Sequence, residues 1–149
     1  MIKKNILIIS LLIFLSNCGF TPIYLNNKNI NFSIEQVNYT GDRELNNFLK
    51  TILNQYKDEK VDNKIFIETS SVYKKNILSK NKTGEVSDYQ IEVEVIFLLK
   101  PSNKKIIITE KKIMEAKSDK FEEAKYEKTI KQNFASSISY KLTSELAVN

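Results

Sequence analysis

The chain has 149 residues, a formal net charge of +5, three glycines, one cysteine and no histidine. The lack of histidine excludes histidine-based triads, general bases and metal sites, and the few glycines argue against a glycine-rich phosphate loop. A chain of this length fits one domain with one hydrophobic core. Its basic residues are almost all lysine, Arg43 being the only arginine. The charge therefore permits an anionic partner, and we expect no nucleic-acid binding.

The first segment has the features of an export signal. Lys3 and Lys4 precede an apolar run from Ile6 to Leu15, which is too short to span a bilayer unaided. Cys18 then follows Leu-Ser-Asn, an arrangement that resembles the lipobox of bacterial lipoproteins. An ordinary secretory signal and an uncleaved anchor are the alternatives.

The lipobox resemblance implies that residues 1–17 are a signal peptide and that Cys18 is lipidated. Asn17 departs from that pattern, in which a small residue is usual. A covalent lipid on Cys18 would use the single cysteine, so we expect no disulfide, cysteine-metal site or other cofactor. Gly19 replaces the Asp that in enteric bacteria tends to hold a lipoprotein at the inner membrane. The resemblance thus implies an outer-membrane location at the periplasmic face.

Residues 18–29 are predicted to be an extended, lipidated tether that leads into a single domain over residues 30–149. A first strand is expected over Ile30–Tyr39. Its early apolar residues share one face, whereas Val37 and Tyr39 are out of phase with them. This change of phase predicts a β-bulge or an early end of the strand.

A helix is expected to begin after Gly41-Asp42, with Asp42 as its N-cap, and to end at Lys57–Lys60. Apolar residues recur along it with the period of an amphipathic helix. The residues of this stripe are Leu45, Phe48, Leu49, Ile52, Leu53 and Tyr56.

Three strands are expected to follow. The first covers Lys64–Lys74, and the second shows strict apolar alternation from Tyr89 to Leu99. Ile96 and Leu98 make the end of that second strand apolar on both faces, so we expect something to cover it. The third strand is expected over Lys104–Ala116, with a bulge near residues 110–112 because Ile113 is out of phase with Ile106 and Ile108.

A last, long helix is expected after the cap Ser118-Asp119. Its apolar residues are spaced by four, namely Tyr126, Ile130, Phe134, Ile138, Leu142 and Leu146. The element order is therefore β-α-β-β-β-α. A crossover helix makes the first two strands parallel, and short loops make the last three an antiparallel meander. We expect an α+β, two-layer fold in which both helices cover one face of a four-stranded mixed sheet.

The start of the predicted mature chain, Cys18-Gly19-Phe20-Thr21-Pro22-Ile23-Tyr24, is similar to that of the LPS-assembly lipoprotein family LptE in its alphaproteobacterial form. The element order agrees with that family over the whole mature chain. Ser87-Asp88-Tyr89-Gln90, followed by an alternating strand and Pro101, is also similar to the family's third strand and turn. The family's carboxy-terminal extensions are absent. The resemblance implies a protein that plugs the outer-membrane β-barrel LptD and binds lipopolysaccharide. Separately, the lack of histidine and the solvent-facing positions expected for the acidic residues lead us to expect that the protein is not an enzyme.

Lysines are expected at the sheet end that lies away from the tether. The loop between the second and third strands contains Lys74, Lys75, Lys80 and Lys82 in this interpretation, and the last link contains Lys117 and Lys120. We take Lys80, Lys82, Lys117 and Lys120 as the candidate lipopolysaccharide site, since lysines suit phosphate groups. The alternative is that these residues are ordinary solvated loop lysines.

Two other functions stay open from the sequence. One is an auxiliary lipoprotein of an ABC-type lipid or solvent export system, which would bind partner proteins. The other is a lipid-anchored hydrolase that uses carboxylates. Glu92 and Glu94 fit the solvent-facing side of a strand better than a catalytic pair.

Overall fold

The computed structural model describes residues 31–148. The expected signal peptide, the lipidation site Cys18 and the tether over residues 18–29 lie outside the described residues. No helix among residues 31–148 is both long and apolar enough to cross a membrane.

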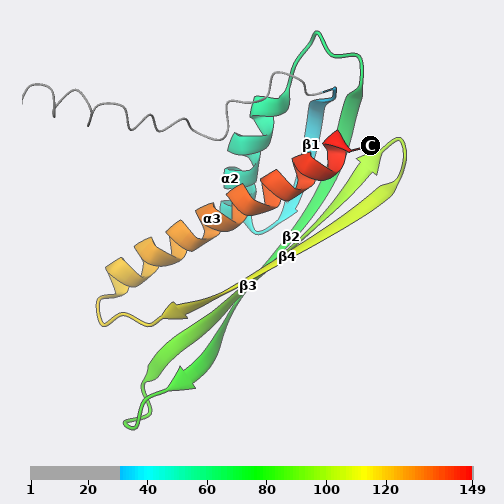
Figure 1. The fold of residues 1–149 in the computed structure, drawn as a ribbon. Helices are drawn as coiled ribbons and strands as arrows, with labels where there is room; N and C mark the ends of the chain where they lie inside the picture. The colour runs from blue at the N-terminus through cyan, green and yellow to red at the C-terminus, as the bar shows by residue number, and fades with distance from the viewer. Residues whose placement is uncertain (1–30, 149) are drawn as a thin grey trace, which may run out of the picture. The chain divides into compact units, whose positions relative to one another are not determined.

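Four strands and two helices form the expected α+β fold (Figure 1). The strands lie in the order β1-β2-β3-β4, with β1 parallel to β2 and the other neighbours antiparallel. Their bounds are Ser33–Gly41, Lys64–Lys80, Val86–Lys100 and Lys104–Glu115. The helices α2 and α3 span Arg43–Leu53 and Lys120–Ala147, and a short 3-10 turn, η2, covers Asn54–Tyr56.

The predicted bulge in β1 is confirmed. The β1–β2 register shifts between Ile34 and Gln36, which leaves Glu35 as the extra residue. Ile34 is buried before the shift, and Val37 and Tyr39 face the same side as the buried Ile67 and Thr69 after it. The bulge thus restores the inward phase of the strand.

The helix α2 begins where the sequence predicts. The carboxylate of Asp42 accepts a hydrogen bond from the backbone N–H of Leu45 at 2.8 Å. Gly41 precedes the cap with φ of +96°, and a Cβ atom there would lie 1.8 Å from the carbonyl oxygen of Ser71. Only glycine fits this turn, because the chain passes directly against β2.

Strand β2 is longer than the predicted Lys64–Lys74, and this changes the plan of the sheet. It runs to Lys80, whereas β1 ends at Gly41, opposite Ser71. The turn into α2 therefore lies midway along β2. Beyond Ser71, β2 is hydrogen-bonded on one side only, to β3.

The predicted bulge in the last strand is wrong. The β3–β4 register is unbroken from Asp88 opposite Glu115 to Leu99 opposite Lys104. Ile113 is out of phase because it lies on the face away from the helices, where its side chain is 62% exposed. In the sequence, an apolar residue on the face without helices gives the same pattern as a change of register.

The core lies between the helices and one face of the sheet. The α3 stripe is confirmed except for Tyr126, which is exposed near the start of the helix. The alternating apolar residues of β3 point toward the helices, and those from Ile91 to Leu99 are buried in the core. The buried apolar residues of α2, β3 and α3 include Leu45, Leu49, Leu53, Ile91, Val93, Val95, Phe97, Leu99, Ile130, Phe134, Ile138, Leu142 and Leu146.

Candidate functional site

The four predicted site lysines lie at the same end of the sheet. Lys80 is the last residue of β2 and is paired with Val86, while Lys82 lies in the following turn. The link from β4 to α3 holds Lys117 and leads to Lys120, the first residue of α3. The N–H of Ala116 donates to the carbonyl of Ser87 at 2.9 Å, which attaches this link to the start of β3.

These lysines differ in how they are paired. Lys117 Nζ lies 2.9 Å from a carboxylate oxygen of Glu115, and Lys120 Nζ lies 3.2 Å from one of Glu123. The hydrogen bond with Glu115 raises the pKa of Lys117. Lys80 and Lys82 have no ion pair with any residue of the 31–148 segment. The unpaired positive charge of the set is therefore concentrated at the β2–β3 turn.

Lys74 and Lys75 are strand residues and not loop residues, which corrects the expectation from the sequence. Lys74 lies on the face of β2 that points away from the helices. Lys75 points to the helix side, where its Nζ lies 2.7 Å from Glu127 and 3.2 Å from Glu123, both on α3. These two lysines were misplaced because β2 continues beyond its apolar alternation.

A cluster of charged and aromatic side chains joins α3 to β2 beneath the first turns of the helix. We call it the ionic cluster, and it consists of Tyr73, Lys75, Glu123, Glu127 and Lys131. The hydroxyl of Tyr73 donates to Glu127 at 2.6 Å. The ammonium group of Lys131 lies 4.0 Å from the centre of the Tyr73 ring and 3.0 Å from Glu44 of α2. The cluster thus connects α2, α3 and the sheet.

The charges of the ionic cluster are held by one another. Burial lowers the pKa of Lys75, but hydrogen bonds to Glu127 and Glu123 outweigh it, so the pKa is raised overall. Burial raises the pKa of Glu127, and the hydrogen bonds from Lys75 and Tyr73 reverse this effect and lower it. Burial followed by the bond to Glu127 raises the pKa of Tyr73. The raised pKa of Lys75 and the lowered pKa values of Glu123 and Glu127 favour the charged forms of all three, which is typical of a structural cluster and not of an acid–base pair.

The opposite face of the sheet, which we call the open face, has no helix over it (Figure 1). Phe66, Ile96, Leu98 and Ile107 lie on this face at the end near the start of β2. Phe66 is 43% and Ile107 53% exposed. A shallow groove of about 450 Å³ crosses β1, β2 and β3 here, lined by Asn38, Thr40, Glu68, Thr69, Ser70, Ile96 and Leu98.

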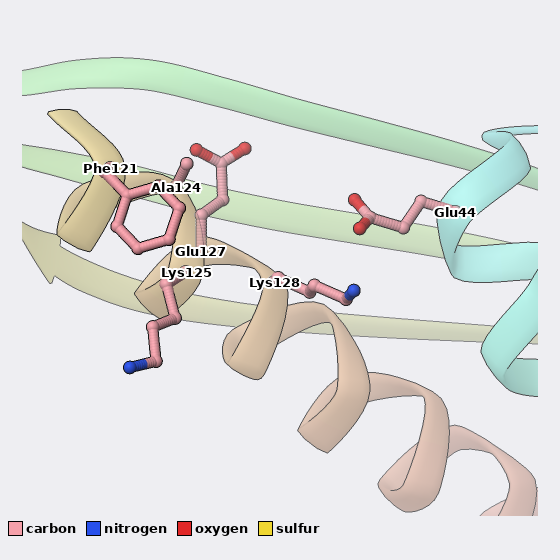
Figure 2. A pocket seen from close by; sticks show the side chains of 6 residues that line it. All are labelled: Glu44, Phe121, Ala124, Lys125, Glu127 and Lys128. Carbon is pink, nitrogen blue, oxygen red and sulfur yellow. The ribbon is translucent and has the colours of Figure 1, made fainter.

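A second hollow of about 480 Å³ lies between the start of α2 and the first turns of α3. Figure 2 shows Glu44 extending from α2 toward the α3 residues, with Phe121 and Ala124 on the opposite wall. The lining carries both signs of charge, so it has no clear preference for an anion or a cation. In the described part of the chain, no group of three or more metal-ligating side chains could hold a metal ion.

Sequence reasoning missed two features, the ionic cluster and the exposed aliphatic residues Ile77 and Leu78 near the end of the β2–β3 hairpin. The cluster joins residues about fifty positions apart, and its glutamates look locally like helix N-terminal charges. The adjacent Ile77 and Leu78 would have been a usable signal, because two neighbouring aliphatic residues interrupt a lysine-rich stretch.

Comparisons with known proteins identify the fold. No protein-family model and no curated protein matches the sequence. The rare lipoprotein B structure from Shewanella oneidensis has a TM-score of 0.51 at 16% identity, covering 74% of this chain and 95% of that one. An uncharacterized lipoprotein B from Nitrosomonas europaea has the same TM-score and identity, covering 78% and 88%. The chain therefore shares its α+β fold with these two lipoproteins.

Proposed function

We propose that this protein is an outer-membrane lipoprotein of the LptE type, anchored through a lipid on Cys18 at the periplasmic face. In this role it plugs and supports an LptD-like β-barrel and binds lipopolysaccharide on its way to the outer leaflet. The observation that carries the proposal is the open face of the sheet. The lipobox-like sequence around Cys18 and the fold shared with two lipoproteins support it.

The open face suits a protein partner better than bulk water. Phe66, Val72 and Ile107 each expose more than two fifths of their surface, and Ile96 lies directly opposite Ile107 in the β3–β4 register. Contiguous exposed aliphatic surface of this kind marks interaction sites on proteins. Charged side chains such as Glu92 and Lys111, which are ion-paired at 3.2 Å, lie on the same face. A mixed apolar and charged face suits the interior wall of a large barrel.

The lysines supply the second half of the proposal. Lys80, Lys82, Lys117 and Lys120 lie at the end of the sheet opposite the start of the domain. Lipopolysaccharide carries phosphate groups near its acyl chains, and exposed lysines suit phosphates as mobile point charges. The two lysines without ion pairs, Lys80 and Lys82, are the first candidates for this contact.

Co-purification of the full-length protein from detergent-solubilised outer membranes tests the proposal. A large β-barrel should be recovered in roughly equal amount, because the open face needs a cover. Ile107→Glu should reduce this recovery by placing a charge in the interface, whereas Tyr140→Glu, at an exposed position of α3, should not. Recovery with inner-membrane transporter subunits alone would instead support an ABC-type auxiliary lipoprotein.

A further inference from the structure

Strand β2 has a free edge beyond the end of β1. The last residue of β1, Gly41, lies opposite Ser71, whereas β2 stays paired with β3 as far as Lys80. Figure 1 shows β2 continuing past the turn that leads from β1 into α2. We call the side of residues 72–77 that points away from β3 the free edge. A strand placed beside it would continue the line of β1.

The backbone of the free edge presents a row of hydrogen-bonding groups. The carbonyl of Ser71 accepts from the N–H of Asp42 at 3.2 Å, so the backbone groups of Ser71 point to the β1 side. Because these groups alternate in direction along a strand, every second residue after Ser71 points them out of the free edge, namely Tyr73, Lys75 and Ile77. Among residues 31–148, no segment other than β3 pairs with this part of β2. An unpaired row of this kind is a template for another strand.

The hollow of about 480 Å³ between α2 and α3 lies on the helix side of the free edge. Its wall includes Glu127, which accepts hydrogen bonds from Tyr73 at 2.6 Å and from Lys75 at 2.7 Å. The hollow thus adjoins two of the three residues whose backbone groups point outward. Phe121 and Ala124 form its apolar wall (Figure 2), and Phe121 is 75% exposed. A side chain that points to the helix side from a strand beside β2 has an apolar surface to pack against there.

Lysines without ion pairs lie on both sides of the free edge. Lys74 is on the open face, and Lys128 lines the hollow on the helix side. Neither lysine forms an ion pair with any residue between 31 and 148. The hollow carries both signs of charge, but its two acidic residues, Glu44 and Glu127, are already ion-paired within the domain. The charge that is left for a partner is therefore positive.

These features select the kind of chain that fits the free edge. A second copy of this protein fits poorly, because antiparallel pairing of two free edges would bring the lysines of one copy against those of the other. Lysines on an edge strand oppose self-pairing for this reason. An extended segment with acidic side chains matches both the outward backbone groups and the positive charge. A small anion would match the charge alone and leave the backbone row unpaired.

We propose that the free edge of β2 binds an extended, acidic segment of another protein by strand addition. The added strand continues the line of β1, with acidic side chains toward Lys74 on the open face and apolar side chains toward Phe121 in the hollow. This inference goes beyond the proposed function, because it needs neither lipopolysaccharide nor a barrel. It assigns the partner by its chemistry and gives the edge and the hollow a single occupant.

Amide hydrogen exchange of the full-length protein, followed residue by residue by NMR, tests this inference. The probe is a synthetic peptide, acetylated and amidated at its ends, with the sequence Glu-Val-Glu-Val-Glu-Val-Glu. Saturating peptide should slow exchange at Tyr73, Lys75 and Ile77 by about tenfold or more, since their N–H groups gain acceptors. Exchange at the residues between them, which already donate to β3, should stay unchanged. Only a strand beside this edge produces that alternation.

Two kinds of control separate strand addition from simple charge attraction. The same peptide with N-methyl groups on every second residue keeps its charge but cannot complete the ladder, and it should give no protection. Lys74→Glu with Lys128→Glu should weaken binding of the parent peptide about tenfold. The matched control, Lys50→Glu with Lys105→Glu on α2 and β4, should bind like the parent, because these lysines lie away from the free edge.

Several results would overturn the proposal. Equal binding of the N-methylated peptide would show that charge alone attracts it, and equal protection along all of residues 72–77 would show a general stiffening. Protection without peptide that rises with protein concentration would assign the edge to a second copy. Protection without peptide that is independent of concentration would assign it to another segment of the same chain. The proposed function would stand in each case, because its test depends on recovery of a barrel and on Ile107.

Discussion

The Nζ atom of Lys75 on β2 lies 2.7 Å from Oε2 of Glu127 on α3, two residues that are 52 positions apart in the chain. Lys75 also covers the ring of Tyr89 on β3 at 4.2 Å. The side chains of Lys75 and Glu127 are 24% and 21% exposed. One lysine thus fastens the first turns of the long helix to two strands, in a part of the sheet that α2 does not reach.

Removing one member of this pair should destabilise the domain. Lys75→Met leaves Glu127 half-buried without its cation, and we expect a loss of about 1–3 kcal/mol in the free energy of unfolding. Urea denaturation checks this value. Lys75→Met combined with Glu127→Leu should recover part of the loss, because neither charge is then left unpaired. If the double variant loses more unfolding free energy than Lys75→Met and Glu127→Leu lose separately when added together, this account is contradicted.

The same cluster predicts a pH dependence. The pKa values of Glu123 and Glu127 are lowered in the folded protein, so their stabilisation is complete above the ordinary value of 4.5 and is lost as the pH falls through the folded values. The pKa of Lys75 is raised, so its contribution is complete below 10.5 and is lost at higher pH. Thermal melts should therefore show an acid loss that begins near pH 4.5. Glu123→Gln with Glu127→Gln should flatten that loss.

The two glycines with positive φ offer a matched test of the turn into α2. Gly41→Ala should cost about 2 kcal/mol or more, because the new Cβ would meet the Ser71 carbonyl in addition to the backbone strain. Gly84→Ala meets no atom within 4 Å and should cost only the strain, about 1 kcal/mol. Equal losses of unfolding free energy for the two variants would show that the contact with Ser71 is unimportant.

Lipidation at Cys18 is a further prediction. Cys18→Ala should abolish labelling by radioactive palmitate and release the protein from membranes, because the variant lacks the thiol that we propose is acylated. Asn17→Ala places the usual small residue before the cysteine and should keep the label. Persistent labelling of the Cys18 variant would remove the lipoprotein assignment.

Charge reversal tests the lysine site as a set. Glutamate at Lys80, Lys82, Lys117 and Lys120 together should weaken lipopolysaccharide binding, whereas reversal of Lys100, Lys104 and Lys105 at the other end of the sheet should matter less. Binding should also weaken as the salt concentration rises, since these charges are exposed. A single exposed charge contributes little, so the set is the informative variant. Unchanged binding by the fourfold variant would mean that these are ordinary solvated lysines.

Local sequence signals predicted most of the fold. Gly41-Asp42 followed by an apolar stripe located α2, and the alternation from Tyr89 to Leu99 located β3. The end of β2 could not be predicted in the same way. Its stretch from Lys74 to Lys80 has no alternating apolar pattern and becomes a strand because β3 provides a partner for it. Pairing across the sheet overrode local propensity there.

The sequence predicted at which end of the sheet the candidate site lies, but not how its lysines are paired. The topology alone placed the β2–β3 turn and the link to α3 at one end. The pairing of Lys117 with Glu115, two residues before it, and of Lys120 with Glu123, three residues after it, is local and was overlooked. The inward direction of Lys75 depends instead on Glu123 and Glu127 of a helix that follows much later in the chain. That contact is tertiary, and the local sequence has no signal for it.

Strand β3 is hydrogen-bonded to a neighbour on each side from Asp88 to Leu99. Its amide hydrogens have no local route to solvent, so they should exchange with deuterium only when the whole domain unfolds. The part of β2 beyond Ser71 has a hydrogen-bonded neighbour on one side only, so its amide hydrogens should exchange more readily than those of β3. The free energy of local opening should therefore be highest for β3, in the middle of the sheet, and lowest at the end of the β2–β3 hairpin.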